Sequence, residues 1–221
     1  MTYADEPDAF PFKDNEVLYG IAETASKGRT IYLSATPDKR LTDRVNEGTL
    51  AVLSLLQRPH GHPVPVPVIF TAPLPVLLVR MVLFIRQHRT APLLVFVPSK
   101  RMAGIMGAII NMFIPCAVCT SSKKDRDSVI EAFRQGEQRI MVTTTVMERG
   151  VTIPGADIIV FEADHPVFDR ASLTQMAGRA GRSFEHPDGS VLFLCRQKCT
   201  AADLCRKETV EANASLSSVR A

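Results

Sequence analysis

Residues 93–119 read LLVFVPSKRMAGIMGAIINMFIPCAVC, and this stretch decides the fold. An apolar run over 93–97 stops at Pro98, a longer segment with helical periodicity covers 100–113, and a second apolar run follows over 114–119. A short apolar run that ends at a proline favours a buried strand, whereas the longer periodic segment favours a helix. The stretch therefore predicts a strand, a helix and a second strand.

The same alternation continues toward the C-terminus. We expect helices over 125–134, over 171–180 and from about residue 201, and strands over 140–143, 158–161 and 191–194. Such alternation is typical of an α/β fold in which a mostly parallel sheet is covered by helices on both faces. Nearer the N-terminus, a helix over 16–27 and a strand over 30–34 predict a smaller α/β piece.

A proline-rich segment separates these two parts. Residues 57–75 contain six prolines, namely Pro59, Pro63, Pro65, Pro67, Pro73 and Pro75. Because proline fixes φ and lacks a backbone donor, no regular helix is expected through this segment. We predict a domain over 1–56, a stiff linker over 57–75, a second domain over 76–212, and a frayed polar tail over 213–221.

The composition is that of a folded protein, with 46% hydrophobic and 22% charged residues among 221 and a net charge of +3. This balance excludes a disordered chain and permits nucleic-acid binding without requiring it. The apolar stretch 74–85 contains Pro75 and Arg80 and is shorter than the roughly 20 residues of a membrane span.

The cysteines give information on compartment and metal binding. Five cysteines, an odd number, in a chain without a hydrophobic leader favour a reducing cytoplasm. Cys116 and Cys119 form a C-x-x-C pair that is compatible with a zinc site. Because no second such pair follows and the surrounding run is apolar, we expect a core strand there instead.

Adjacent carboxylates occur in Tyr3-Ala4-Asp5-Glu6-Pro7-Asp8. At the end of a strand, one carboxylate can hold Mg²⁺ while the other orients the attacking water for nucleotide hydrolysis. The alternative is a solvated acidic tail. Ser34 and Thr36 would lie at the end of the next strand, where their hydroxyls can bond to these carboxylates. The alternative is that Thr36 or Asp38 caps a helix that opens at Pro37.

The most specific pattern is Gln175-Met176-Ala177-Gly178-Arg179-Ala180-Gly181-Arg182. Two arginines three positions apart at the end of a helix, with glycines that permit close approach, suit a transferring phosphoryl group. The alternative is a glycine-rich helix terminus with solvated arginines.

Hydroxyl and cationic side chains follow two other predicted strands. Thr143, Thr144 and Thr145 can bind a nucleic-acid phosphate without reading sequence, although Thr143 also suits a strand. Ser99 and Lys100 come at a helix start, where cations oppose the helix dipole and suggest a bound polyanion; a solvated helix face is the alternative.

Taken in order, these motifs resemble motifs II to VI of the superfamily-two DEAD/DEAH-type helicases. The segments DEPDAFPF at 5–12, HGHPVPVP at 60–67 and ERGVT at 148–152 further resemble the bacterial ComFA family of late competence, with PriA-like replication-restart helicases as the alternative. The resemblance implies a complete second RecA-like lobe, preceded by part of a first, in an ATP-dependent DNA motor.

The resemblance also implies roles for particular residues. Asp5 would hold magnesium, Glu6 would position the lytic water, and Ser34 and Thr36 would couple hydrolysis to motion. The remaining residues fall into two groups. Around ATP we expect Gly150, Gln175, Arg179 and Arg182, with Arg182 as the arginine finger. On the backbone of single-stranded DNA we expect Ser99, Lys100 and Thr144.

The sequence departs from the family in one respect that affects catalysis. No G-x-x-x-x-G-K-[ST] loop occurs, and the family's upstream four-cysteine zinc module is absent. We therefore expect an N-terminally truncated helicase that does not hydrolyse ATP alone. Its expected partners are single-stranded DNA and the competence uptake machinery at the inner face of the membrane. A non-enzymatic nucleic-acid-binding or assembly module is the alternative of a different class.

Overall fold

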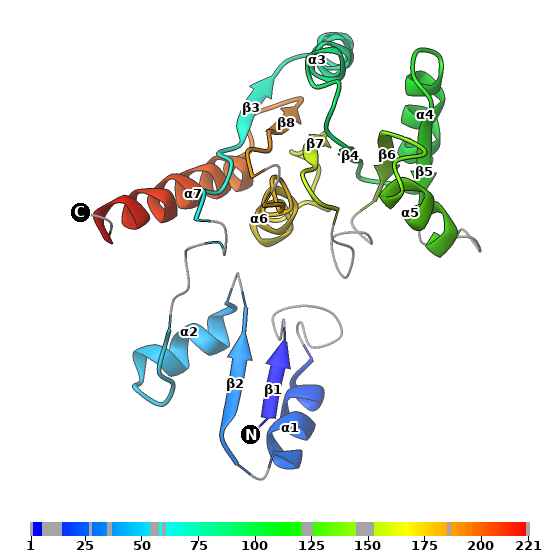
Figure 1. Cartoon of the computed structure of the whole chain (residues 1–221). Helices are drawn as coiled ribbons and strands as arrows, with labels where there is room; N and C mark the ends of the chain where they lie inside the picture. The colour runs from blue at the N-terminus through cyan, green and yellow to red at the C-terminus, as the bar shows by residue number, and fades with distance from the viewer. Residues whose placement is uncertain are drawn as a thin grey trace. The chain divides into compact units, whose positions relative to one another are not determined.

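The computed structural model describes residues 2–5, 15–26, 28–34, 37–53, 58, 61–120, 126–144, 153–184 and 187–219. The chain divides into two compact units, Met1–Leu55 and Leu56–Ala221 (Figure 1). Each unit has its own sheet and its own helices.

The first unit is a small α/β piece, as the sequence predicts. Strands β1 (Thr2–Asp5) and β2 (Thr30–Leu33) pair in parallel, with Asp5 opposite Leu33. Helix α1 (Glu16–Ala25) connects them, and α2 (Lys39–Asn46) follows β2. The Asp38 side chain caps α2 by accepting from the backbone N–H of Leu41 at 2.9 Å, so the capping alternative holds for Asp38.

The second unit is built on a parallel sheet of six strands. The strands are β3 (Val68–Thr71), β4 (Leu93–Phe96), β5 (Cys116–Cys119), β6 (Ile140–Thr143), β7 (Asp157–Phe161) and β8 (Val191–Cys195). They lie in the order β3-β8-β7-β4-β6-β5, and every neighbouring pair is parallel. The α/β fold class is therefore confirmed, and the C-x-x-C pair lies within a strand, as predicted.

Helices cover both faces of this sheet (Figure 1). Helices α3 (Leu74–Gln87) and α4 (Lys100–Asn111) pack on one face, around a core that includes Met81, Met106 and Phe161. Helices α5 (Arg126–Arg134), α6 (Arg170–Ala177) and α7 (Thr200–Val219) pack on the other, around Phe96, Phe133 and Phe193. The strands β4, β6, β7 and β8 are buried along their whole length, which explains why their residues are apolar except for Thr143 at the end of β6 and Asp157 at the start of β7.

Two boundaries differ from the prediction. Residues 57–75 are not a linker throughout, because Val68–Thr71 forms the edge strand β3 and α3 begins at Leu74. Prolines are tolerated beside an edge strand and in the first turn of a helix. Residues 213–219 belong to α7 rather than to a frayed tail: the Asn213 amide accepts from the Val64 N–H at 3.0 Å and donates to the Val64 carbonyl at 2.9 Å.

Among the residues that the structure describes, no helix combines the length and the apolar sequence that a membrane crossing requires. The same residues contain no group of three or more His, Cys, Asp or Glu side chains that could hold a metal ion.

A buried ionic cluster lies at the amino end of the central strands. The Asp157 carboxylate accepts from the Ser190 backbone N–H at 2.7 Å and lies 3.0 Å from Nδ1 of His88. Arg139 donates to the His88 carbonyl oxygen and so closes the cluster. Burial raises the pKa of Asp157 above its ordinary value of 3.8, outweighing the Ser190 hydrogen bond and the nearby His88 and Arg139, which lower it.

This cluster gives a first prediction. Asp157→Ala is expected to lower the free energy of unfolding by about 2–3 kcal/mol, because it leaves the half-buried Ser190 N–H without its charged acceptor. Asp157→Asn keeps an acceptor and is expected to cost less than about 1 kcal/mol. Because the folded pKa is raised, wild type should lose stability relative to the Asn variant as pH rises from about 4 to 7. Urea unfolding at both pH values measures this, and the opposite pH trend would contradict it.

Candidate functional site

The candidate nucleic-acid site lies where β4 and β6 end. These strands are neighbours, with Phe96 opposite Thr143, and the Val97 N–H donates to the Thr143 carbonyl at 2.9 Å. After β4, the chain forms β5 and β6 toward one edge of the sheet. It then crosses β4 to form β7 and β8 toward the other edge, so the strand order reverses at β4. Open α/β sheets bind their ligands beyond the carboxyl ends of strands at such a point.

Ser99 and Lys100 stand at the start of α4, directly after β4. The Ser99 Oγ accepts from the Met102 N–H at 3.1 Å as the N-cap, and both side chains are exposed. Because the Ser99 hydroxyl acts as an acceptor in the cap, it can still donate its proton outward. The first turn of α4 contains no acidic residue, so an anion approaching it meets hydroxyl, ammonium and backbone donors.

Thr144 follows β6 and has an unusual environment. Its side chain is only 6% exposed, and its Oγ1 makes no hydrogen bond to any residue that the structure describes. A buried hydroxyl without a partner costs about 1–3 kcal/mol. A phosphate oxygen bound at this edge would give the Thr144 hydroxyl a partner. The neighbouring Thr143 hydroxyl donates to the Thr144 carbonyl at 3.3 Å.

Three residues of the motif over 175–182 lie at and after the end of α6. Gln175 is on the helix and half-buried, whereas Arg179 and Arg182 follow its last residue, Ala177. Arg179 is 9% exposed, and Arg182 is exposed with its Nε donating to the Gly178 carbonyl at 2.7 Å. We call residues 178–182 the α6 turn; it places one arginine inside the unit and one at its surface.

Arg58 also contributes to the α6 turn and was missed by sequence reasoning. Its Nη1 donates to the carbonyls of Ala180 at 2.7 Å and Gly181 at 3.3 Å, and its Nη2 donates to that of Gly178 at 3.0 Å. Burial and the nearby Arg182 lower its pKa to about 10, so the guanidinium stays charged at neutral pH. No local signal could reveal this contact, because it spans more than a hundred residues of sequence.

Close backbone packing fixes the other side of the α6 turn. Gly181 has φ of +64°, its N–H donates to the Ala156 carbonyl at 3.2 Å, and a Cβ there would overlap the Pro187 carbonyl oxygen. A Cβ on Gly189 would likewise lie 3.0 Å from the Ala156 carbonyl oxygen. The predicted role of glycine in permitting close approach therefore has a structural basis at Gly181.

In the first unit, the structure brings two of the predicted residues to one edge of the sheet. Asp5 ends β1 and Ser34 directly follows β2, and these parallel neighbours are in register. Glu6 and Thr36, and also Gly150 of the second unit, lie outside the described residues.

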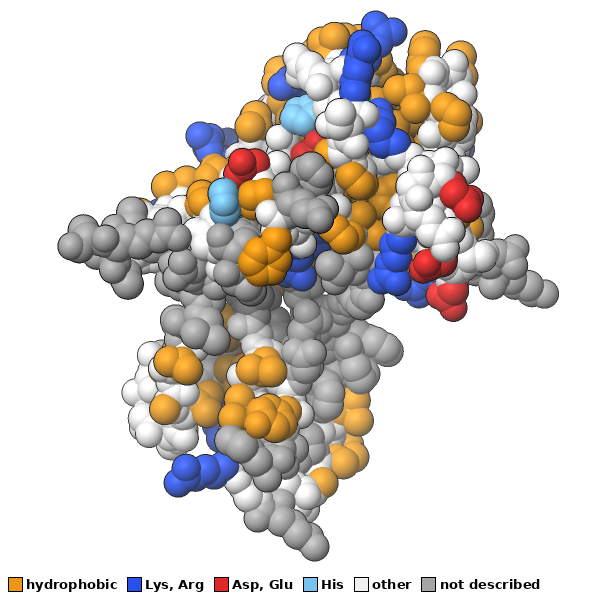
Figure 2. All heavy atoms as spheres, viewed as in Figure 1, with side chains coloured by type: hydrophobic (Ala, Val, Ile, Leu, Met, Phe, Trp, Pro, Cys, Tyr) orange, Lys and Arg blue, Asp and Glu red, His pale blue; other side chains and the backbone are white. Residues whose placement is uncertain are grey.

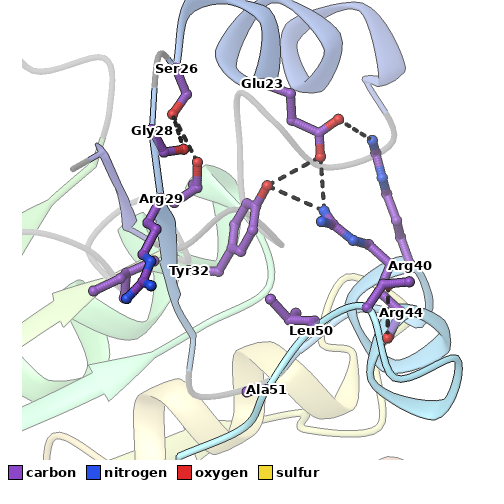
Figure 3. A pocket seen from close by; sticks show the side chains of 12 residues that line it. Glu23, Ser26, Gly28, Arg29, Tyr32, Arg40, Arg44, Leu50 and Ala51 are labelled. Atoms are coloured by element: carbon purple, nitrogen blue, oxygen red, sulfur yellow. Dashed lines mark hydrogen bonds and ion pairs between the residues drawn. The ribbon is translucent and has the colours of Figure 1, made fainter.

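The first unit also has a cavity of about 750 Å³, shown in Figure 3. The Glu23 carboxylate at its rim accepts from Arg44 at 2.9 Å, from the Tyr32 hydroxyl at 3.1 Å and from Arg40 at 3.3 Å. The Arg40 guanidinium also stacks 4.3 Å from the Tyr19 ring centroid. These contacts join α1, β2 and α2, so we assign the network to the stability of this unit.

The chain is similar in sequence to known helicase proteins. The helicase conserved C-terminal domain matches residues 75–184. The competence protein ComFA of Streptococcus pneumoniae is 37% identical over 213 residues, covering 87% of this chain and 48% of that protein. ComFA of Bacillus subtilis is 30% identical over 223 residues, covering 95% of this chain and 48% of that protein. The chain thus spans about half the length of these two relatives.

A solved structure shows the same fold. Dbp5 of S. cerevisiae, bound to RNA and ADP BeF3, superposes with a TM-score of 0.68 at 17% sequence identity, covering 95% of this chain and 56% of that one. This likeness shows the RecA-like fold, and the match to the helicase conserved C-terminal domain identifies the second unit as a helicase C-terminal lobe.

Proposed function

Because the chain contains the helicase conserved C-terminal domain and is a superfamily-two protein similar to the ComFA competence proteins, we propose that it is part of an ATP-dependent motor that moves single-stranded DNA. The proposed setting is DNA uptake during competence, on the cytoplasmic side of the membrane. A PriA-like role in replication restart is the alternative within the same superfamily.

One observation carries the DNA-binding part of this proposal. Ser99 and Thr144 follow neighbouring strands, and the buried Thr144 hydroxyl has no hydrogen-bond partner in the described part of the chain. Together with the exposed Lys100 they offer hydroxyl and ammonium donors and no base-reading side chain. Such a set suits phosphate oxygens of any sequence.

The proposed cofactor is ATP with magnesium. Asp5 would hold the magnesium ion and Glu6 the lytic water, while Ser34 and Thr36 would sense hydrolysis. Gly150, Gln175 and Arg179 would contact the nucleotide, and Arg182 would act as the arginine finger. The donor set fits the group, since a strand-end aspartate supplies the oxygen ligand that magnesium prefers and an arginine fork matches phosphate. Bound magnesium would neutralise charge that develops on the transferring phosphoryl group.

A second candidate function has a specific observation in its favour. The 221-residue sequence contains no G-x-x-x-x-G-K-[ST] loop, whose amides and lysine cradle the β- and γ-phosphates. We therefore expect this chain alone to bind DNA without hydrolysing ATP, either as part of a longer motor or as a non-enzymatic binding module. ATP turnover by the pure chain that is stimulated by single-stranded DNA would contradict this expectation.

The proposed DNA contact is tested by titrating fluorescent single-stranded DNA across a salt series. Lys100→Ala should reduce the slope of log affinity against log salt by about 0.7, because one phosphate contact is lost. The matched control is Lys207→Ala on α7, which should leave the slope unchanged. If the two variants behave alike, α4 does not contact the DNA.

Thr144→Val is expected to weaken DNA binding while it increases the stability of the fold. Removing the unpartnered hydroxyl should raise the free energy of unfolding by about 1 kcal/mol, because its burial cost disappears. The same change should weaken DNA binding about fivefold, since one phosphate hydrogen bond of about 1 kcal/mol is lost. Urea unfolding and the same DNA titration measure both effects. A variant that is less stable than wild type would show that the hydroxyl has a structural partner instead.

A further inference from the structure

Helix α3 has an unusual composition for a helix on the surface of its unit. Of its fourteen residues, LPVLLVRMVLFIRQ, all but Arg80, Arg86 and Gln87 are apolar. Leu77, Met81, Phe84 and Ile85 point into the core. A helix that is hydrophobic on all sides is normally buried on all sides, whereas the outward stripe of α3 has Val76, Val79 and Leu83 exposed by 46%, 59% and 47%.

The apolar surface continues onto the end of α4. A cavity of about 290 Å³ lies between the C-terminal ends of the two helices, lined by Val82, Ile85 and Arg86 from α3 and by Ile110 from α4. Met112 and Phe113 at its rim are exposed by 77% and 61%. Figure 2 shows hydrophobic side chains gathered over α3 and α4, with Lys and Arg side chains beside them.

The charged side chains on α3 and α4 are all cationic. Residues 48–124, which include both helices, contain no aspartate or glutamate. On α3, Arg80 is adjacent to Val76 and Leu83 at helical spacing, and Arg86 continues the stripe three residues after Leu83. The charged residues on α3 itself are both arginines, so its apolar stripe is complementary to an apolar surface flanked by carboxylates.

We propose that this surface docks an acidic amphipathic helix of another protein. We call it the docking face and define it by Val76, Val79, Arg80, Leu83, Arg86, Met112 and Phe113. The helix would lay its apolar side chains along the α3 stripe, insert one into the cavity and pair its carboxylates with the two arginines. A symmetric second copy of this chain is disfavoured because it would oppose arginine to arginine, and a shaped cavity suits a side chain better than a lipid surface.

The test uses two synthetic helical peptides that share leucines at positions i, i+3, i+4 and i+7. One carries glutamates and the other lysines at the flanking positions, and their binding to the whole chain is measured by fluorescence anisotropy. The glutamate peptide is expected to bind at least tenfold more tightly than the lysine peptide, with affinity falling as salt increases. Leu83→Glu should reduce binding of the glutamate peptide at least tenfold, and so should Arg86→Glu.

Matched controls lie on α7. Leu204 is 43% exposed, close to the 47% of Leu83, so Leu204→Glu should perturb the fold equally while leaving peptide binding unchanged. Arg206→Glu is the corresponding control for charge. Equal binding of both peptides, absence of binding, or preferential binding to vesicles of anionic lipid would each overturn the proposal. Because DNA binding is assigned to Ser99, Lys100 and Thr144, none of which belongs to the docking face, loss of one activity does not imply loss of the other.

Discussion

Gly181→Ala is expected to lower the free energy of unfolding of the second unit by about 3–5 kcal/mol. The residue has φ of +64°, a conformation that costs an L-residue about 1–2 kcal/mol. The added Cβ would also overlap the Pro187 carbonyl oxygen and lie 2.8 Å from the Gly189 nitrogen, both of which are backbone atoms. A backbone neighbour cannot move away as a flexible side chain does. Since domains are stable by only about 5–15 kcal/mol, this loss should bring the unit close to unfolding at 37 °C.

Gly104→Ala supplies the matched control for this prediction. Gly104 lies within α4, and a Cβ there would meet nothing within 4 Å. Alanine is the better helix former by about 1 kcal/mol, so this variant should be as stable as wild type or more stable. Urea unfolding followed by circular dichroism compares the two. Similar midpoints for Gly181→Ala and wild type would show that the α6 turn relaxes at little cost.

The central strands could be predicted from sequence because of where they lie in the sheet. Strands β4, β6 and β7 are buried on both faces, so their sequences are apolar apart from Thr143 and Asp157 at strand ends, and polar or turn residues follow them. Edge strand β3 lacks that signature: it has four residues, its first is exposed, and prolines flank it on both sides. The same prolines that indicate a linker are compatible with a short edge strand.

The candidate site was predictable residue by residue, but its assembly was not. Spacing placed Ser99 after one strand and Thr144 after another, and both positions hold in the structure. That the two strands are neighbours depends on strand order, which a single sequence does not encode locally. The environment of Thr144 is equally non-local, because a buried unpartnered hydroxyl is identified from the packing around it.

Contacts between residues distant in sequence account for the remaining differences between the predicted and the observed structure. Residues 213–219 have the small polar composition of a frayed end, yet Asn213 binds both backbone groups of Val64 and the helix continues through them. Both partners of this contact are unremarkable in sequence. The same is true of Arg58, which has no motif around it and whose partners lie on the α6 turn.

Arg58→Ala is the second change with a large expected effect, a loss of about 2–4 kcal/mol in the free energy of unfolding. Hydrogen bonds from a charged donor contribute about 1.5–3 kcal/mol, and carbonyls left without a donor add a desolvation cost. The Ala180 and Gly181 carbonyls lose Arg58 as their donor, whereas that of Gly178 keeps Arg182. Amide hydrogen exchange should therefore quicken first in residues 178–182, ahead of the sheet.

Arg58→Lys and Arg89→Ala distinguish a specific arginine fork from a general effect of charge. A lysine ammonium cannot reach three carbonyls in the fork geometry of a guanidinium, so Arg58→Lys should recover less than half of the lost stability. Arg89 is exposed and donates its Nε to the nearby Arg86 carbonyl at 2.9 Å, so Arg89→Ala should change stability by less than about 0.5 kcal/mol. Because Arg58 and Arg182 share the Gly178 carbonyl, Arg58→Ala should also alter the environment of Arg182, the proposed arginine finger. Full stability and unchanged exchange in Arg58→Lys would instead mean that positive charge alone holds the α6 turn.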